Sequence, residues 1–151
     1  MRIALIESLW RVGLLPINAV RPFAIEALAD GFSGPALFEL ADGGYGTWRE
    51  VEETFGRALI EMGRAPLTEE EASMQAAWCI CEDIASGAVE PYRGIERIRR
   101  LRLFDGIDGV FGSVVYFDVW HWMDAVALRD SAEGIRQAAR DLVMRRDTVG
   151  G

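Results

Sequence analysis

The sequence predicts an all-α fold, built as an irregular bundle of seven or eight short helices. Three observations carry this prediction. Half of the 151 residues are hydrophobic, and in most stretches they recur at the three- and four-residue spacing of an amphipathic helix. Short segments rich in glycine and proline separate these stretches. The length suits one domain, so we expect residues 1–151 to form a single helical domain.

The first two helices are expected before residue 30. The first spans Arg2–Val12 and turns one apolar side inward, with Gly13 closing it. Asn18 is a candidate cap for the second helix. Pro22 is tolerated only in a first turn, so that helix is expected to start near Arg21 and to run to residue 29.

The next two helices are bounded by clear stop and start signals. Gly31 suits a left-handed cap, and Pro35 suits the first turn of a short helix, Ala36–Ala41. Thr47 followed by Glu50 is a capping-box pattern, which predicts the start of a longer helix. Its expected inward side chains recur at helical spacing: Val51, Phe55, Leu59 and Met62.

A fifth helix is expected between two further signals. Thr68 followed by Glu71 forms a second capping-box pattern, and Gly87 lies near the expected end. One apolar stripe is predicted on this helix: Met74, Trp78, Cys81, Ala85 and Ala88.

Pro91 is predicted to open a sixth helix, Tyr92–Leu103. Its outer face carries Arg93, Arg97 and Arg100, and we expect them to pair with the neighbouring acidic helix. Residues 109–122 fit a helix better than a strand, although valine, tyrosine, phenylalanine and tryptophan favour strands. The final helix is expected at Ala132–Arg146, where two arginines suit a helix C-terminus.

The charge of the chain restricts its partners. There are 16 basic and 24 acidic residues, a net charge of −8. Every basic residue is an arginine, so the lysine of a P-loop or of a Schiff base is absent. Nucleic acids and anionic membranes need a positive footprint and are not expected as partners.

The sequence also bears on the cell compartment. The N-terminal segment lacks the order of a signal peptide, and no apolar run is long enough to span a membrane. Cys79 and Cys81 suit a reducing environment. We expect a cytoplasmic protein with no cofactor.

The acidic excess is concentrated in the middle of the chain. Residues 31–90 hold 3 arginines and 12 acidic residues, a net charge of −9. The candidate partner-binding residues on this acidic face are Glu50, Glu53, Glu69, Glu70 and Glu71. Acidic residues also stabilise the N-terminal turns of helices, so both interpretations apply to the same side chains.

Two alternatives come from the segment around the only histidine. Asp118, His121 and Asp124 recur every three residues, which on a helix gives one side able to hold a metal or to serve a hydrolytic enzyme. A Cys–His pair with Cys79 or Cys81 is a weaker form of the enzyme hypothesis. The aromatic side chains nearby predict either core packing or the interface of a homodimer.

Two sequence blocks carry a resemblance. The first is Asp30-Gly31 followed by Pro35, Leu37 and Glu39-Leu40-Ala41. The second joins Ile84 to these five residues: Gly87, Pro91, Tyr92, Gly94 and Ile98. Together with Phe55, Ala58-Leu59 and Gly63, they resemble a group of small, acidic, helical bacterial proteins of uncharacterised function. Proteins of this sort resemble immunity-type partners of secreted toxins.

The resemblance implies an all-α fold and no known activity. Gly87 and Pro91 suit a helix stop and start, and Gly94 can permit close helix packing. The favoured hypothesis is a non-enzymatic, cytoplasmic interaction module, immunity-like, that binds a basic protein partner through its acidic helical face.

Overall fold

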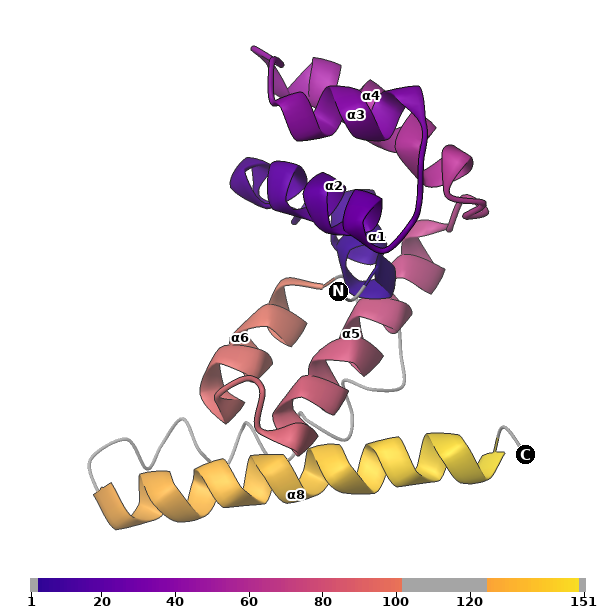
Figure 1. Cartoon of the computed structure of the whole chain (residues 1–151). Coiled ribbons are helices and arrows are strands. Elements are labelled where there is room, and N and C mark those ends of the chain that lie inside the picture. Colours follow the sequence, from indigo (N-terminus) through magenta and orange to yellow (C-terminus); the bar gives the residue numbers. More distant parts are fainter. Residues whose placement is uncertain (1–2, 102–124, 150–151) are drawn as a thin grey trace. The chain divides into compact units, whose positions relative to one another are not determined.

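The computed structural model describes residues 3–101 and 125–149 (Figure 1). The predicted all-α class is confirmed: the described residues form seven α-helices and one short 3₁₀ turn, and none of them forms a strand. The elements are α1 (Ile3–Arg11), η1 (Ile17–Ala19), α2 (Val20–Ala29), α3 (Pro35–Asp42), α4 (Trp48–Glu61), α5 (Glu69–Ser86), α6 (Pro91–Arg100) and α8 (Ala125–Val149).

The contacts divide the chain into two compact units, Met1–Glu69 and Glu70–Gly151. Each unit is described by itself, and the single-domain expectation stays a prediction. Among the described helices, none has the length and apolar character needed to cross a bilayer.

The first unit packs α1 to α4 around one apolar core. Its centre is Phe55 of α4, whose ring centroid lies 5.0 Å from that of Phe23 and 5.3 Å from that of Trp10. The predicted inward residues of α4 are all buried, as are Leu37 and Leu40 of α3. Burial of such side chains stabilises the fold by about 1.5–3 kcal/mol each.

The predicted helix starts and ends of this unit are largely confirmed. Gly31 has a φ of 94° and follows α2, and Pro35 occupies the first turn of α3. Thr47 and Glu50 form the predicted capping box. The assignment of Asn18 as a cap is wrong, because it lies inside η1 and the N-cap of α2 is Ala19.

The second unit contains α5, α6 and α8. Gly94 of α6 faces α5, where a Cβ would overlap with the side chain of Ile84. The predicted close helix packing at this glycine is therefore confirmed. Helix α8 contacts α6, and within its residues 131–146 the buried ones are Ile135, Ala139 and Leu142.

Three boundary or face predictions in this unit are wrong. Helix α6 ends at Arg100, because Leu101 adopts an extended conformation, and α8 is longer than the expected Ala132–Arg146. The fully buried side of α5 runs through Ala72, Ala76, Ala77, Ile80, Cys81 and Ile84. Of the predicted stripe, Cys81 is buried, but Met74, Trp78 and Ala85 are half-buried, and Ala88 is exposed beyond the helix. Helix α6 meets this side at Ile80 and Ile84, opposite Gly94, so the buried face is set by the packing of another helix.

Candidate interaction sites

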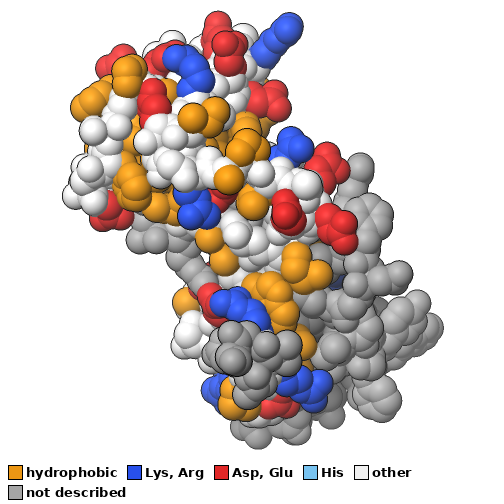
Figure 2. All heavy atoms as spheres, turned by 90° about the vertical axis from the view of Figure 1, so that its right-hand side faces the viewer, with side chains coloured by type: hydrophobic (Ala, Val, Ile, Leu, Met, Phe, Trp, Pro, Cys, Tyr) orange, Lys and Arg blue, Asp and Glu red, His pale blue; other side chains and the backbone are white. Residues whose placement is uncertain are grey.

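The predicted acidic residues lie at the starts of two helices. Glu50 and Glu53 belong to the first turns of α4, and the other three open α5; all five are exposed. Figure 2 shows several acidic side chains on the visible face. The structure places these residues on two helix starts, and their use as one partner-binding face stays a prediction.

Glu50 has an additional structural role. Its Oε2 accepts hydrogen bonds from the backbone N–H groups of Gly46 and Thr47, at 2.9 and 3.0 Å. These bonds, and that with the Thr47 side chain, lower the pKa of the Glu50 carboxyl below its ordinary value. Since this carboxylate already has partners, Glu53 is the more available group on α4.

Both blocks that carry the family resemblance are explained by helix geometry. Glu39 accepts hydrogen bonds from Thr54 at 3.2 Å and from Arg57 at 3.1 Å, which joins α3 to α4. In the second block, Gly87 has a φ of 82° beyond α5, and Pro91 stands in the first turn of α6.

The remaining residues of the second block belong to α6. Tyr92 is half-buried, Gly94 faces α5, and Ile98 is buried. Glu90 caps this helix by accepting bonds from the backbone N–H groups of Tyr92 and Arg93, at 3.2 and 3.0 Å. Gly94 and Ile98 therefore support the packing of α6, whereas Gly87 and Pro91 mark helix ends.

The arginine stripe of α6 differs from expectation. Arg93, Arg97 and Arg100 are exposed, and within residues 3–101 and 125–149 their side chains form no ion pair. The expected pairing with the neighbouring acidic helix is therefore not observed there. On the same unit, Arg146 of α8 takes such a role, since its Nη1 lies 3.0 Å from Glu82 and its guanidinium lies 5.5 Å from the Trp78 ring centroid.

The cysteine chemistry considered from the sequence is disfavoured by the environment of the thiols. Cys79 and Cys81 are buried and form no disulfide. Burial, followed by the nearby Glu82 and Cys79, raises the pKa of Cys81 to about 12. A thiol with such a pKa is almost entirely protonated at neutral pH and is a poor nucleophile.

The proposed metal site cannot be placed. Asp118, His121 and Asp124 lie outside the described residues, as does the aromatic segment considered for a homodimer. In the ranges that the structure does describe, no three metal-ligating side chains gather. Both alternatives therefore stay predictions.

A buried ion pair in the first unit was missed by the sequence analysis. Glu7 of α1 is 3% exposed, and its Oε2 accepts bonds from Nε and Nη2 of Arg64 at 2.9 and 2.6 Å. The signal was present, because Glu7 follows Ile3 by four residues and precedes Trp10 by three, and so shares their inward side.

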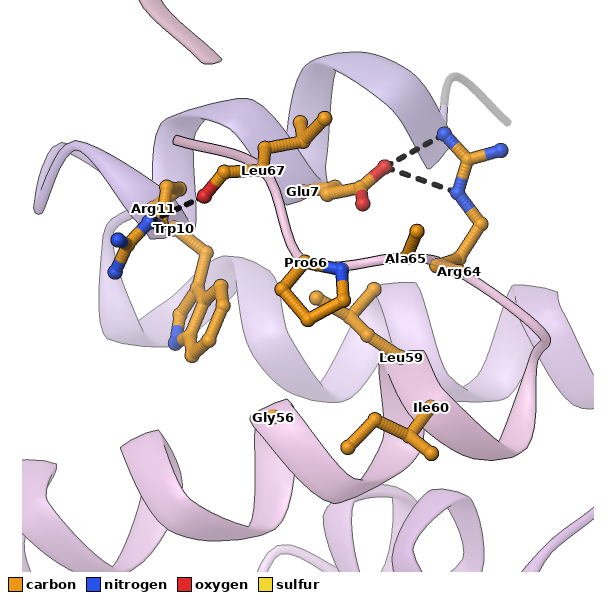
Figure 3. Close-up of a pocket in the computed structure, with 10 residues that line it drawn as sticks. All are labelled: Glu7, Trp10, Arg11, Gly56, Leu59, Ile60, Arg64, Ala65, Pro66 and Leu67. Carbon is orange, nitrogen blue, oxygen red and sulfur yellow. Dashed lines mark hydrogen bonds and ion pairs between the residues drawn. The ribbon is translucent and has the colours of Figure 1, made fainter. Parts of the chain in front are cut away.

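This ion pair borders a pocket of about 220 Å³ (Figure 3). The pocket lies between α1, α4 and the segment 64–67, and its lining includes Trp10, Gly56, Leu59, Ile60 and Pro66. Arg11 stands beside Trp10 and donates from Nε to the carbonyl of Leu67 at 2.7 Å. The buried indole N–H of Trp10 has no acceptor in the described part of the chain.

Comparison with known proteins gives no match for this chain, whether to a family model, a curated protein or a solved structure.

Proposed function

We propose that this protein is a non-enzymatic interaction module that binds a basic protein partner through exposed acidic side chains. The observation that carries the proposal is the exposure of Glu53, Glu69 and Glu70 in the central part of the chain, where acidic residues exceed arginines by nine. Such side chains steer a basic partner by long-range attraction and then pair with its lysines and arginines.

The proposed compartment is the cytoplasm, where the two thiols would stay reduced. The proposal keeps the immunity-type interpretation, in which the basic partner is a toxin that this protein neutralises. An acidic inhibitor surface of this kind would act by covering the basic surface of its target, and it needs no chemistry of its own.

The test compares two variants with the same change in charge. In the first, Glu53, Glu69 and Glu70 are replaced by lysine. In the matched control, three exposed acidic residues elsewhere are replaced by lysine: Glu26, Asp42 and Glu96. Glu50 is kept in both, because its replacement would also break the capping box.

Each protein is immobilised and exposed to a lysate of the native host at low ionic strength. We expect the unmodified protein and the control to retain one basic protein in stoichiometric amount, and moderate salt to release it, because exposed charges are screened. The first variant should lose it. Equal retention of that protein by both variants would refute the proposal, as would retention that salt does not weaken.

A further inference from the structure

The pocket of the first unit has the size of a side-chain receptor. Its volume of about 220 Å³ lies below the roughly 300–1,000 Å³ of pockets that hold drug-sized ligands or cofactors. Its central lining is apolar, with Leu59, Ile60 and Pro66 lying between Trp10 and Arg11 at one end and the Glu7–Arg64 pair at the other (Figure 3). A single apolar side chain fits such a space.

Ile60 forms an open wall of the pocket, with 66% of the residue exposed. Gly56 lies one turn earlier on α4, next to the Trp10 ring. Because it has no side chain, it leaves space in the pocket at this point. Recessed apolar walls with a polar rim are the usual setting for the anchor residues of protein interfaces.

The charged groups that line the pocket already have partners: Glu7 pairs with Arg64, and Arg11 donates to the carbonyl of Leu67. Glu53 lies outside this lining, on the helix that carries Gly56 and Ile60. Glu53 precedes Gly56 by three residues and Ile60 by seven, so the three share one face of α4. Glu53 is exposed, and it is also one of the acidic residues of the proposed function. Arg11 can donate its remaining N–H groups to carbonyl oxygens, which every protein backbone supplies.

We propose that this pocket receives an apolar side chain of the basic partner, and that a lysine or arginine adjacent to this anchor pairs with Glu53. The proposal rests on the proposed function and names the side chains that the partner must present. The apolar anchor supplies binding free energy by leaving water, and the ion pair sets its orientation.

The test uses three synthetic peptides as probes. The first is acetyl-Lys-Phe-Lys-Lys-amide, the second replaces phenylalanine by alanine, and the third replaces all lysines by glutamate. Binding is followed by two-dimensional ¹H–¹⁵N NMR of the whole chain, with the Gly56 amide and the Trp10 indole as reporters of the pocket. The phenylalanine peptide should shift both signals and bind at least about tenfold more tightly than the alanine peptide, since burying such a side chain contributes about 1.5–3 kcal/mol.

Two pairs of variants separate the anchor from the charge. Ile60→Ala should weaken binding of the phenylalanine peptide, whereas Ile25→Ala, also at an exposed isoleucine (51%), should not. Glu53→Gln should weaken binding at low salt, whereas Glu26→Gln on α2 should not. Because all four side chains are exposed, these variants keep the fold, which the dispersion of the same spectra verifies.

The outcomes distinguish this inference from the proposed function. If the alanine peptide binds as tightly as the phenylalanine peptide and shifts only the Glu53 region, the pocket is not a receptor, while acidic recognition survives. Equal binding of the glutamate peptide would overturn the role of Glu53. Absence of any shift at the Gly56 amide with millimolar phenylalanine peptide would overturn the inference as a whole.

Discussion

The contact between α5 and α6 at Gly94 gives a prediction whose magnitude follows from the structure. In Gly94→Ala, the new methyl group would overlap with the buried side chain of Ile84. Overpacking of this kind costs about 1–3 kcal/mol. Replacing glycine by alanine within a helix contributes about 1 kcal/mol in the opposite direction. The expected net result therefore ranges from no change to a loss of about 2 kcal/mol.

Gly134→Ala is the matched control, because it lies inside α8 of the same unit and a Cβ there meets nothing within 4 Å. This variant should gain the full helix-propensity term of about 1 kcal/mol. The free energies of unfolding of the two variants should then differ by about 1–3 kcal/mol, which is the cost of the overlap alone. Urea denaturation followed by far-UV circular dichroism measures this difference.

A third variant makes the reasoning stricter. Ile84→Val removes Cδ1, one of the two Ile84 atoms that the new Cβ would meet, and keeps Cγ1. The double variant with Gly94→Ala should therefore lose somewhat less than the sum of the two single losses. If Gly94→Ala stabilises the protein as much as Gly134→Ala does, the close approach of α5 and α6 at this point is wrong.

Three further predictions concern charged and titratable groups. Arg64→Met should cost about 2 kcal/mol in urea denaturation, because it leaves the buried carboxylate of Glu7 without its partner; the value is below the roughly 3–5 kcal/mol of a fully buried pair because the Arg64 side chain is 38% exposed. Arg57→Met, which breaks an exposed pair, should cost less than about 1 kcal/mol, and equal costs would contradict the buried pairing. The pKa of Glu50 is lowered in the folded protein, so its stabilising contribution is present above its unfolded pKa and is lost as pH falls through the folded value; Glu50→Gln should therefore flatten the acid side of the stability profile, and an unchanged profile would argue against the capping box. With Cys79 replaced by serine, the native thiol of Cys81 should react with iodoacetamide at pH 8 at least about 100-fold more slowly than the unfolded one, because burial, the largest cause of its raised pKa, remains; comparable rates would show that the thiol is accessible.

Local signals explain how much of the fold could be predicted. Some signals act within a few residues of chain, as do Gly31, Pro35 and the Thr47–Glu50 capping box. Their effects on helix boundaries can therefore be predicted from the sequence. The inward face of α4 was predicted for the same reason. The face of α5 was predicted correctly only at Cys81, because which side is buried depends on the helices that pack against it, and α6 meets α5 at Ile80 and Ile84.

In the candidate sites too, features set by the local sequence could be predicted, and features set by tertiary packing could not. The exposure of Glu53, Glu69 and Glu70 could be expected from composition and helix position. The pocket could not, because its walls come from α1, α4 and the segment 64–67, and no local pattern relates Trp10 to Pro66. Glu7 could have been noticed from its place on the apolar side of α1, but its partner Arg64 could not be identified without the fold.

The bonds from α1 to the end of its unit have a consequence for the growing chain. Glu7 and Arg64 are 57 positions apart, and Arg11 and Leu67 are 56 apart. At a synthesis rate of about 5–20 residues per second, α1 leaves the ribosome roughly 3–11 s before its partners do. During that interval the helix must either wait unfolded or expose the indole of Trp10 and a carboxylate that the finished protein buries. The first unit can therefore close only when its last residues arrive, and a chain that stops before Arg64 would present this helix to chaperones and proteases.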